Sequence, residues 1–115
     1  MELVKDKGLA REIGVSNHTC QTMMDMLKWC THRPAVNQVE IHPFNAQDVF
    51  VKFCQENGIV VTGFSPLGAA SYSWLDSETQ QTVLTDATLG AIAAKLGKTV
   101  AQVSECVGVR GCLCL

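Results

Sequence analysis

Charge is the first property that this sequence has little of. Only 17% of its 115 residues are charged, against 47% that are hydrophobic, and the formal net charge is −2. The lysines and arginines form no cluster that could neutralise a row of phosphates or bind an anionic membrane surface. Nucleic-acid binding and membrane binding are therefore disfavoured, and the composition predicts a single domain with a packed core.

Long apolar runs are also missing. The first ten residues, MELVKDKGLA, lack the apolar segment of a signal peptide. No stretch approaches the ~18 consecutive apolar residues of a membrane span. The sequence therefore predicts a soluble, cytoplasmic protein.

Paired cysteine motifs are absent, although the chain contains six cysteines. Cys20, Cys30 and Cys54 stand among apolar residues at helical spacing, where cysteine behaves as a small hydrophobe. Cys112 and Cys114 form a lone C-x-C, which lacks the paired knuckles of a zinc site. We expect no bound metal and, without a secretory signal, no disulfides.

What the chain does contain is a recurring strand-and-helix unit. Apolar strands are predicted over residues 10–15, 35–41 and 59–64, and amphipathic helices over 19–30 and 46–57. The carboxyl ends of the strands lie about 25 residues apart along the chain. Strands that alternate with helices at this spacing predict βα units and a parallel sheet that is buried on both faces.

The apolar stripes of the first two helices predict which side chains face the sheet. Asn45 and Asp48 resemble a capping box at the start of the second helix, and Gly58 suits its left-handed end. The predicted inward residues are Cys20, Met23, Met24, Leu27 and Cys30 in the first helix, and Val49, Phe50, Phe53 and Cys54 in the second.

The carboxyl half predicts a long loop followed by two helices. The loop holds Tyr72 and Trp74, which either border a ligand or pack within the loop. One helix is predicted from about Asp86 to Gly97, and Thr99 with Gln102 three residues later forms a capping box for the next. The predicted inward residues of the first of these helices are Leu89, Ile92, Ala93 and Leu96.

Polar and aromatic side chains stand at the ends of the three predicted strands. Ser16 and Asn17 end the first strand, Gln38 lies near the end of the second, and Phe64 and Ser65 end the third. Parallel α/β sheets bind ligands at this edge. Carboxamides suit a ligand amide and a ring suits a flat heterocycle, which favours a nicotinamide; the alternative is that Ser16 or Asn17 caps the next helix.

Three motifs carry a resemblance to a known family. GLAREIGVSNH, PAVNQVEIHPF and FCQENGIVVTGFSPLGA resemble successive signatures of the aldo-keto reductases, in the xylose and aldose reductase branch. The resemblance covers residues 1–103 and leaves 104–115 as a divergent C-terminal tail. It implies an incomplete (β/α)8 TIM barrel with about three parallel strands and outer helices, and NADPH-dependent reduction of an aldehyde or ketone to an alcohol.

The resemblance also implies roles for individual residues. Ser16 and Asn17 match the pair that holds the nicotinamide carboxamide, and Gln38 matches the glutamine that joins them. Phe64 stands where the family usually has a tyrosine stacked on the nicotinamide. Ser65 and Leu67 match two further positions that lie along the pyrophosphate of the cofactor. His42 in EIHPF is either a general acid or, as we expect, a loop residue.

The catalytic residues of that family have no counterpart here. Carbonyl reduction needs a tyrosine proton donor tuned by a lysine and a histidine, with an aspartate behind the lysine, because hydride arrival builds negative charge on oxygen. In the family these residues lie on earlier strands, and the one tyrosine, Tyr72, lacks the family's surrounding motif. We therefore assign no catalytic residue and expect the chain alone to be inactive.

The implied cofactor is NADP, although the basic loop that holds its 2′-phosphate has no counterpart near Arg110. A complete barrel takes ~250 residues, so the pattern predicts a splice form, a truncated product or a gene-model fragment. Its outer strands, ending at Val15 and Phe64, would be open sheet edges that favour self-association. The alternative function is a non-catalytic binding or regulatory protein on the same fold.

Overall fold

The computed structural model describes residues 1–68, 82–109 and 112–114, so Tyr72, Trp74 and Arg110 lie outside the described residues. The elements, in chain order, are α1 (Glu2–Asp6), β1 (Gly14–Ser16), α2 (Cys20–Trp29), β2 (Val36–Glu40), α3 (Asp48–Glu56), β3 (Val60–Phe64), the 3-10 helix η2 (Val83–Thr85), α4 (Ala87–Leu96), α5 (Val100–Val109) and β4 (Cys112–Cys114).

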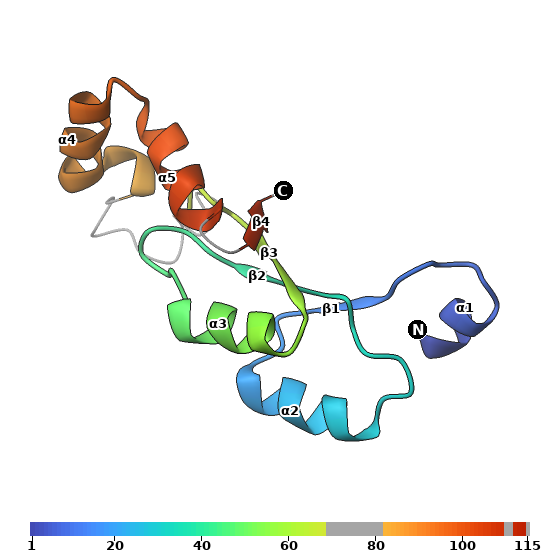
Figure 1. The fold of residues 1–115 in the computed structure, drawn as a ribbon. Coiled ribbons are helices and arrows are strands. Elements are labelled where there is room, and N and C mark those ends of the chain that lie inside the picture. The colour runs from blue at the N-terminus through green and yellow to red at the C-terminus, as the bar shows by residue number, and fades with distance from the viewer. Residues whose placement is uncertain (69–81, 110–111, 115) are drawn as a thin grey trace.

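The four described strands form one parallel sheet in the order β1-β2-β3-β4. Helices α2 and α3 lie side by side against one face of this sheet (Figure 1). The predicted βα units are confirmed, although β1 begins at Gly14 rather than at residue 10. The register places Ser16 beside Gln38 and Gln38 beside Thr62, which fixes how the strand ends meet.

Strand β4 differs from the sequence expectation. Its residues Cys112–Cys114 pair with Val61–Gly63 of β3, so the prediction that β3 is an open edge is wrong. A three-residue strand is too short to show a readable period, which is why the sequence pattern missed it. Within the described residues, the outer strands of the sheet are β1 and β4. The predicted domain boundary after residue 103 falls inside α5.

The main core lies between the sheet and the α2–α3 layer. Met24 and Val49 were expected to face it, but their side chains are 52% and 83% exposed. Each helix contacts the sheet along a narrow stripe, and these two residues lie beside Met23 and Phe50, which occupy it. The buried residues of this cluster are Met23, Val39, Ile41, Phe50, Cys54, Ile59 and Val61, with Cys20, Leu27 and Phe53 packed against them.

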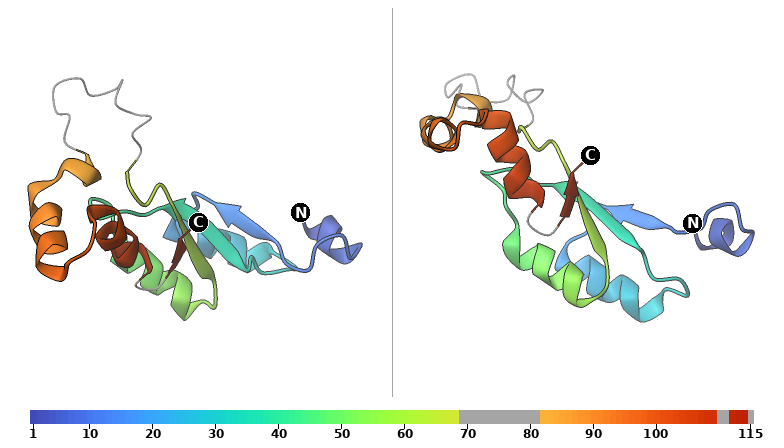
Figure 2. Two further views of the ribbon diagram at one scale, coloured as in Figure 1. Left: turned by 90° about the horizontal axis from the view of Figure 1, so that it is seen from above. Right: turned by 45° about the horizontal axis from the view of Figure 1, so that its top comes forward.

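A second, smaller core joins η2, α4 and α5. Its buried residues are Val83, Leu89, Ala93 and Val103. Ile92 and Leu96 are 41% and 60% exposed, so their predicted inward placement is wrong. Figure 2 shows α4 and α1 at opposite ends of the molecule. None of the described helices is both long and apolar enough to cross a membrane.

The helix ends test the predicted caps. The N-cap of α2 is Thr19, whose hydroxyl accepts the N–H of Thr22 at 3.3 Å, so neither Ser16 nor Asn17 caps that helix. The N-cap of α3 is Gln47, and Asn45 instead donates to the carbonyl oxygen of Glu40; the predicted Asn45–Asp48 box is therefore wrong.

Three other predicted helix ends are confirmed. Gly58 and Gly97 have left-handed φ values of 70° and 62°. The Thr99–Gln102 box forms in both directions, because each residue's backbone N–H donates to the other's side-chain oxygen, at 3.0 and 3.2 Å.

Candidate functional site

The carboxyl ends of β1 and β2 meet at the backbone of Gln38. Its carbonyl oxygen accepts the Ser16 hydroxyl at 2.9 Å and the Asn17 backbone N–H at 2.9 Å. Asn17 adopts a left-handed conformation with φ 56°, which asparagine tolerates better than most residues. Here the chain leaves β1 and turns toward α2, so the turn of residues 16–18 is held against the end of β2.

The side chains at this end leave two carboxamides unused. Neither the Asn17 nor the Gln38 side-chain amide has a hydrogen-bond partner within 1–68, 82–109 and 112–114. Asn17 is exposed and Gln38 is half-buried. Two carboxamides and one hydroxyl therefore lie at one corner of the sheet, where they can donate to and accept from the same small polar ligand.

Phe64 lies one step further along the same sheet face. It is the register partner of Glu40, and Glu40 follows Gln38 by two residues, so the side chains of Gln38, Glu40 and Phe64 share a face. The alternating burial of β2 identifies this face as the one turned away from α2 and α3. The structure thus brings Ser16, Asn17 and Gln38 together. It places Phe64 beside Glu40, which lies two residues after Gln38 in β2.

The turn after β3 contains the remaining two predicted residues, Ser65 and Leu67. Ser65 has φ 52°, and its carbonyl oxygen accepts the N–H of Gly68 at 2.9 Å. Both predicted residues are half-buried. Gly68 has φ 75°, and a Cβ there would come within 3.1 Å of Val83 Cγ2, so this turn packs closely on η2.

His42 lies in the loop after β2. Its backbone forms a bridge with Asn45, and its Nε2 atom is 3.5 Å from Glu40 Oε1. The Nδ1 atom is buried without a hydrogen-bond partner. The ring also meets Phe44 edge-on, with centroids 6.3 Å apart. These contacts fit the expected loop role of His42.

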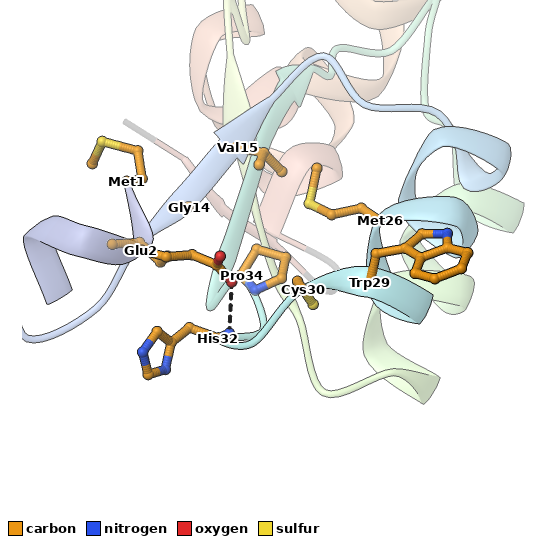
Figure 3. A pocket seen from close by; sticks show the side chains of 10 residues that line it. Met1, Glu2, Gly14, Val15, Met26, Trp29, Cys30, His32 and Pro34 are labelled. Atoms are coloured by element: carbon orange, nitrogen blue, oxygen red, sulfur yellow. Dashed lines mark hydrogen bonds between the residues drawn. The ribbon is translucent and has the colours of Figure 1, made fainter. Parts of the chain in front are cut away.

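A pocket of about 370 Å³ lies at the opposite, amino end of β1 (Figure 3). It contains none of the predicted site residues. Beside it, the Glu2 carboxylate accepts the backbone N–H of His32 at 2.8 Å and that of Thr31 at 2.7 Å. The residues that line it are Met1, Glu2, Ile13, Gly14, Val15, Met26, Trp29, Cys30, His32 and Pro34. Parallel α/β folds place their ligands at the other end of the strands.

Two buried polar residues near the site were not anticipated. Asn37 and Ser104 are both fully buried, and each donates to a carbonyl oxygen in a turn that follows a strand. The only signal in the sequence for these two residues was a polar side chain within an otherwise apolar strand or helix face. The sequence did not indicate the hydrogen-bond partner, because the fold brings the partner close from a distant part of the chain. The residues that the structure describes hold no group of three metal-ligating side chains.

Comparison with known proteins gives consistent matches. The sequence model of the Aldo/keto reductase family matches residues 1–105. The chain is 42% identical over 103 residues to aldose reductase B of Dictyostelium discoideum, covering 90% of this chain and 30% of that protein. It is 45% identical over 107 residues to a probable NAD(P)H-dependent D-xylose reductase of Neosartorya fischeri, covering 90% and 33%.

A solved structure agrees with these relatives. The aldose reductase of Giardia lamblia superposes with a TM-score of 0.76 at 40% identity, covering 90% of this chain and 32% of that one. The chain therefore spans about a third of the length of the proteins that it matches.

Proposed function

The chain belongs to the aldo/keto reductase family and forms part of its (β/α)8 barrel; from this we propose that residues 16–17, 38 and 64–67 form the nicotinamide-binding part of an NADP-dependent carbonyl reductase site. In the whole enzyme the substrate would be a small aldehyde or ketone, reduced to the alcohol. The NAD(P)H-dependent xylose reductases among the relatives support the choice of cofactor class.

One observation carries this proposal: Ser16, Asn17 and Gln38 meet at one corner of the sheet with both side-chain amides unengaged. A nicotinamide carboxamide has one acceptor oxygen and one donor NH2 group. The Asn17 side-chain NH2 group can donate to that oxygen. The Gln38 side-chain oxygen can accept from the nicotinamide NH2 group, and so can the Ser16 hydroxyl oxygen, whose own proton goes to the Gln38 carbonyl. The residues present therefore fit the group.

The remaining residues would orient the rest of the cofactor. Phe64, half-buried on the same face as Gln38, would cover one side of the nicotinamide ring and exclude water from it. Ser65 and Leu67, in the turn after β3, would lie along the pyrophosphate. When bound, the cofactor supplies the hydride, and the role of this chain is to fix the ring that carries it.

We further propose that these 115 residues do not reduce carbonyls by themselves. The described lysines lie on helices or turns, and none stands at the carboxyl end of a strand where a tuned proton donor would need it. The one tyrosine, Tyr72, lies outside the described residues. In this proposal the proton for the substrate oxygen comes from a group outside the residues that the structure describes.

The test compares two identical substitutions. Gln38→Leu removes the proposed nicotinamide contact, and Gln21→Leu makes the same change on the exposed side of α2. In an NADPH fluorescence titration we expect Gln38→Leu to weaken binding about tenfold and Gln21→Leu to leave it unchanged. Equal affinities of the two variants for NADPH would contradict the proposed site.

The proposed lack of turnover has its own test. Aldehyde-dependent NADPH oxidation by the unmodified chain would contradict it.

The open edge of β1 supports a further part of the proposal, self-association. β1 pairs only with β2 among the described strands, so its outer backbone groups lack a strand partner there. Exposed edges of this kind recruit other chains. We expect the sedimentation coefficient to rise with protein concentration; a constant monomer mass across a hundredfold dilution range would contradict this.

A cytoplasmic location also belongs to the proposal. The four cysteines whose state the structure describes, Cys20, Cys30, Cys54 and Cys106, are all free thiols. Free thiols are the rule in reducing compartments. Fractionation of cells that express the chain would place it elsewhere if it were recovered with secreted or organelle proteins.

A further inference from the structure

We infer that Asn37 is a positioning residue that holds the turn of residues 16–18 in the conformation that presents Ser16 and Asn17. Its effect on cofactor binding rests on the proposed function, whereas its effect on the turn rests on the structure alone. Asn37 itself would not touch the cofactor, because its side chain lies on the helix-facing side of the sheet.

The setting of Asn37 makes a polar residue unexpected. Its side chain is 0% exposed, and its register partners on that face are Val15 and Val61. The neighbouring inward positions of the same segment, Val39 and Ile41, are apolar. An amide in such surroundings is unfavourable unless it is hydrogen-bonded. Its presence here therefore calls for a specific partner.

That partner is the turn after β1. Asn37 Nδ2 donates to the carbonyl oxygen of His18 at 2.9 Å, across 19 residues of sequence. The Asn37 Oδ1 atom is buried without a hydrogen-bond partner. The amide thus makes one useful bond, and that bond goes to the turn rather than to the core.

The turn is consequently held by two attachments to β2. In the plane of the sheet, the Gln38 backbone carbonyl oxygen accepts the Ser16 hydroxyl and the Asn17 N–H. On the helix side, the Asn37 side-chain amide donates to the carbonyl oxygen of His18. Two consecutive residues of β2 therefore hold the turn, one through its backbone and the other through its side chain. This double attachment explains how Asn17 is kept at φ 56°.

Helix α2 does not depend on this bond for its start. Its first turn is capped by the Thr19 hydroxyl, which accepts the Thr22 N–H. Loss of the Asn37 amide should therefore loosen residues 16–18 while α2 and the sheet persist. A role in general core packing predicts the opposite, since it would weaken the strands as well.

The experiment uses Asn37→Leu, which keeps the number and branching of the side-chain heavy atoms but removes the amide, with Asn57→Leu as its matched control. Asn57 also donates its amide to a carbonyl oxygen, that of Phe53 at 2.8 Å, but at the far end of α3. Asn37→His serves as the rescue variant, because an imidazole N–H can replace the lost donor. Backbone amide exchange is measured by ¹⁵N NMR on the full chain, with and without NADPH.

In Asn37→Leu we expect the Asn17 amide to exchange about three- to tenfold faster, with Val39 and Val61 unchanged. Asn57→Leu should leave Asn17 as in the parent, and Asn37→His should restore part of its protection. Unchanged Asn17 exchange in Asn37→Leu would overturn the inference. Equal loss of protection at Val39 and Val61 would also overturn it, because Asn37 would then be a general core residue.

The NADPH arm separates this inference from the proposed function. If both hold, Asn37→Leu raises the NADPH dissociation constant about three- to tenfold, whereas Asn57→Leu does not. If NADPH leaves the spectrum of the parent chain unchanged while Asn37→Leu still frees the Asn17 amide, the proposed function fails and the positioning role stands. If NADPH binding responds to Gln38→Leu but not to Asn37→Leu, the positioning role fails for the cofactor alone.

Discussion

Ser104 donates its hydroxyl proton to the carbonyl oxygen of Pro66, 38 residues earlier in the chain. Ser104 is fully buried on α5, and Pro66 lies in the turn after β3. The bond resembles that of Asn37 to the turn after β1. In both cases a buried polar side chain from another element fixes a turn that carries proposed cofactor residues.

Removing this hydroxyl should destabilise the chain. Ser104→Ala leaves the carbonyl oxygen of the half-buried Pro66 without its donor, and we expect a loss of about 1–2 kcal/mol in the free energy of unfolding. Thr88→Ala, at an exposed position of α4, removes a hydroxyl without a buried partner and should change stability by less than about 0.5 kcal/mol. Urea unfolding followed by circular dichroism measures both. Equal midpoints would show that the bond contributes nothing.

Two glycines allow a matched test of packing. A Cβ on Gly14 would lie 2.9 Å from the Val36 carbonyl oxygen, which belongs to the backbone of the neighbouring strand. A Cβ on Gly90, within α4, would meet no atom within 4 Å. We expect Gly14→Ala to cost about 1–3 kcal/mol and Gly90→Ala to add about 0.5–1 kcal/mol of stability. Thermal unfolding compares the two, and a stabilising Gly14→Ala would refute the close approach of β1 to β2.

The parts of the fold that could be predicted from the sequence are those with local signals. The spacing of strands and helices, the left-handed end at Gly58 and the Thr99–Gln102 box all depend on residues close in the chain. Too many residues of α2 and α3 were predicted to face the sheet; Val49, for example, is 83% exposed. Burial depends on what covers a helix, and that information is not contained in the helix itself.

The candidate site shows the same division. Ser16, Asn17 and Gln38 were identified because they stand at strand ends, and the parallel register then brings Ser16 beside Gln38. Asn37 and Ser104 were missed because their partners lie 19 and 38 residues away, and no periodicity encodes such a contact. Whether the site residues bind NADP stays a prediction.

The Glu2 carboxylate supplies a test of how α1 is attached. The backbone N–H groups of His32 and then Thr31 donate to it and hold its pKa below the usual range of a glutamate. A lowered pKa means that the attachment is fully present at neutral pH and is lost as the pH falls through that pKa. The amide proton shifts of residues 31 and 32 should titrate at acidic pH in the parent chain.

Glu2→Gln removes the titrating group, so those acid-induced shifts should disappear from the two amides. Asp25→Asn alters an exposed carboxylate on α2 and should leave them in place. A titration of both amides that persists in Glu2→Gln would contradict the attachment.

The buried thiol of Cys54 should make the free energy of unfolding fall as the pH rises into the alkaline range. Burial, followed by the nearby Cys20, raises the pKa of its thiol to about 11, so the folded chain holds this proton after the unfolded chain has lost it. The stability that Cys54 supports is fully present below the ordinary thiol pKa and is lost as the pH rises through about 11, by on the order of 2 kcal/mol. Urea midpoints should fall over this range, and less steeply in Cys54→Ala. Cys106→Ala, at an exposed position, should keep the full dependence of the urea midpoint on pH.

The raised pKa also leaves little thiolate at Cys54. Iodoacetamide at neutral pH should therefore label Cys106 well before Cys54. Equal labelling rates in the folded chain would contradict the burial of the Cys54 thiol.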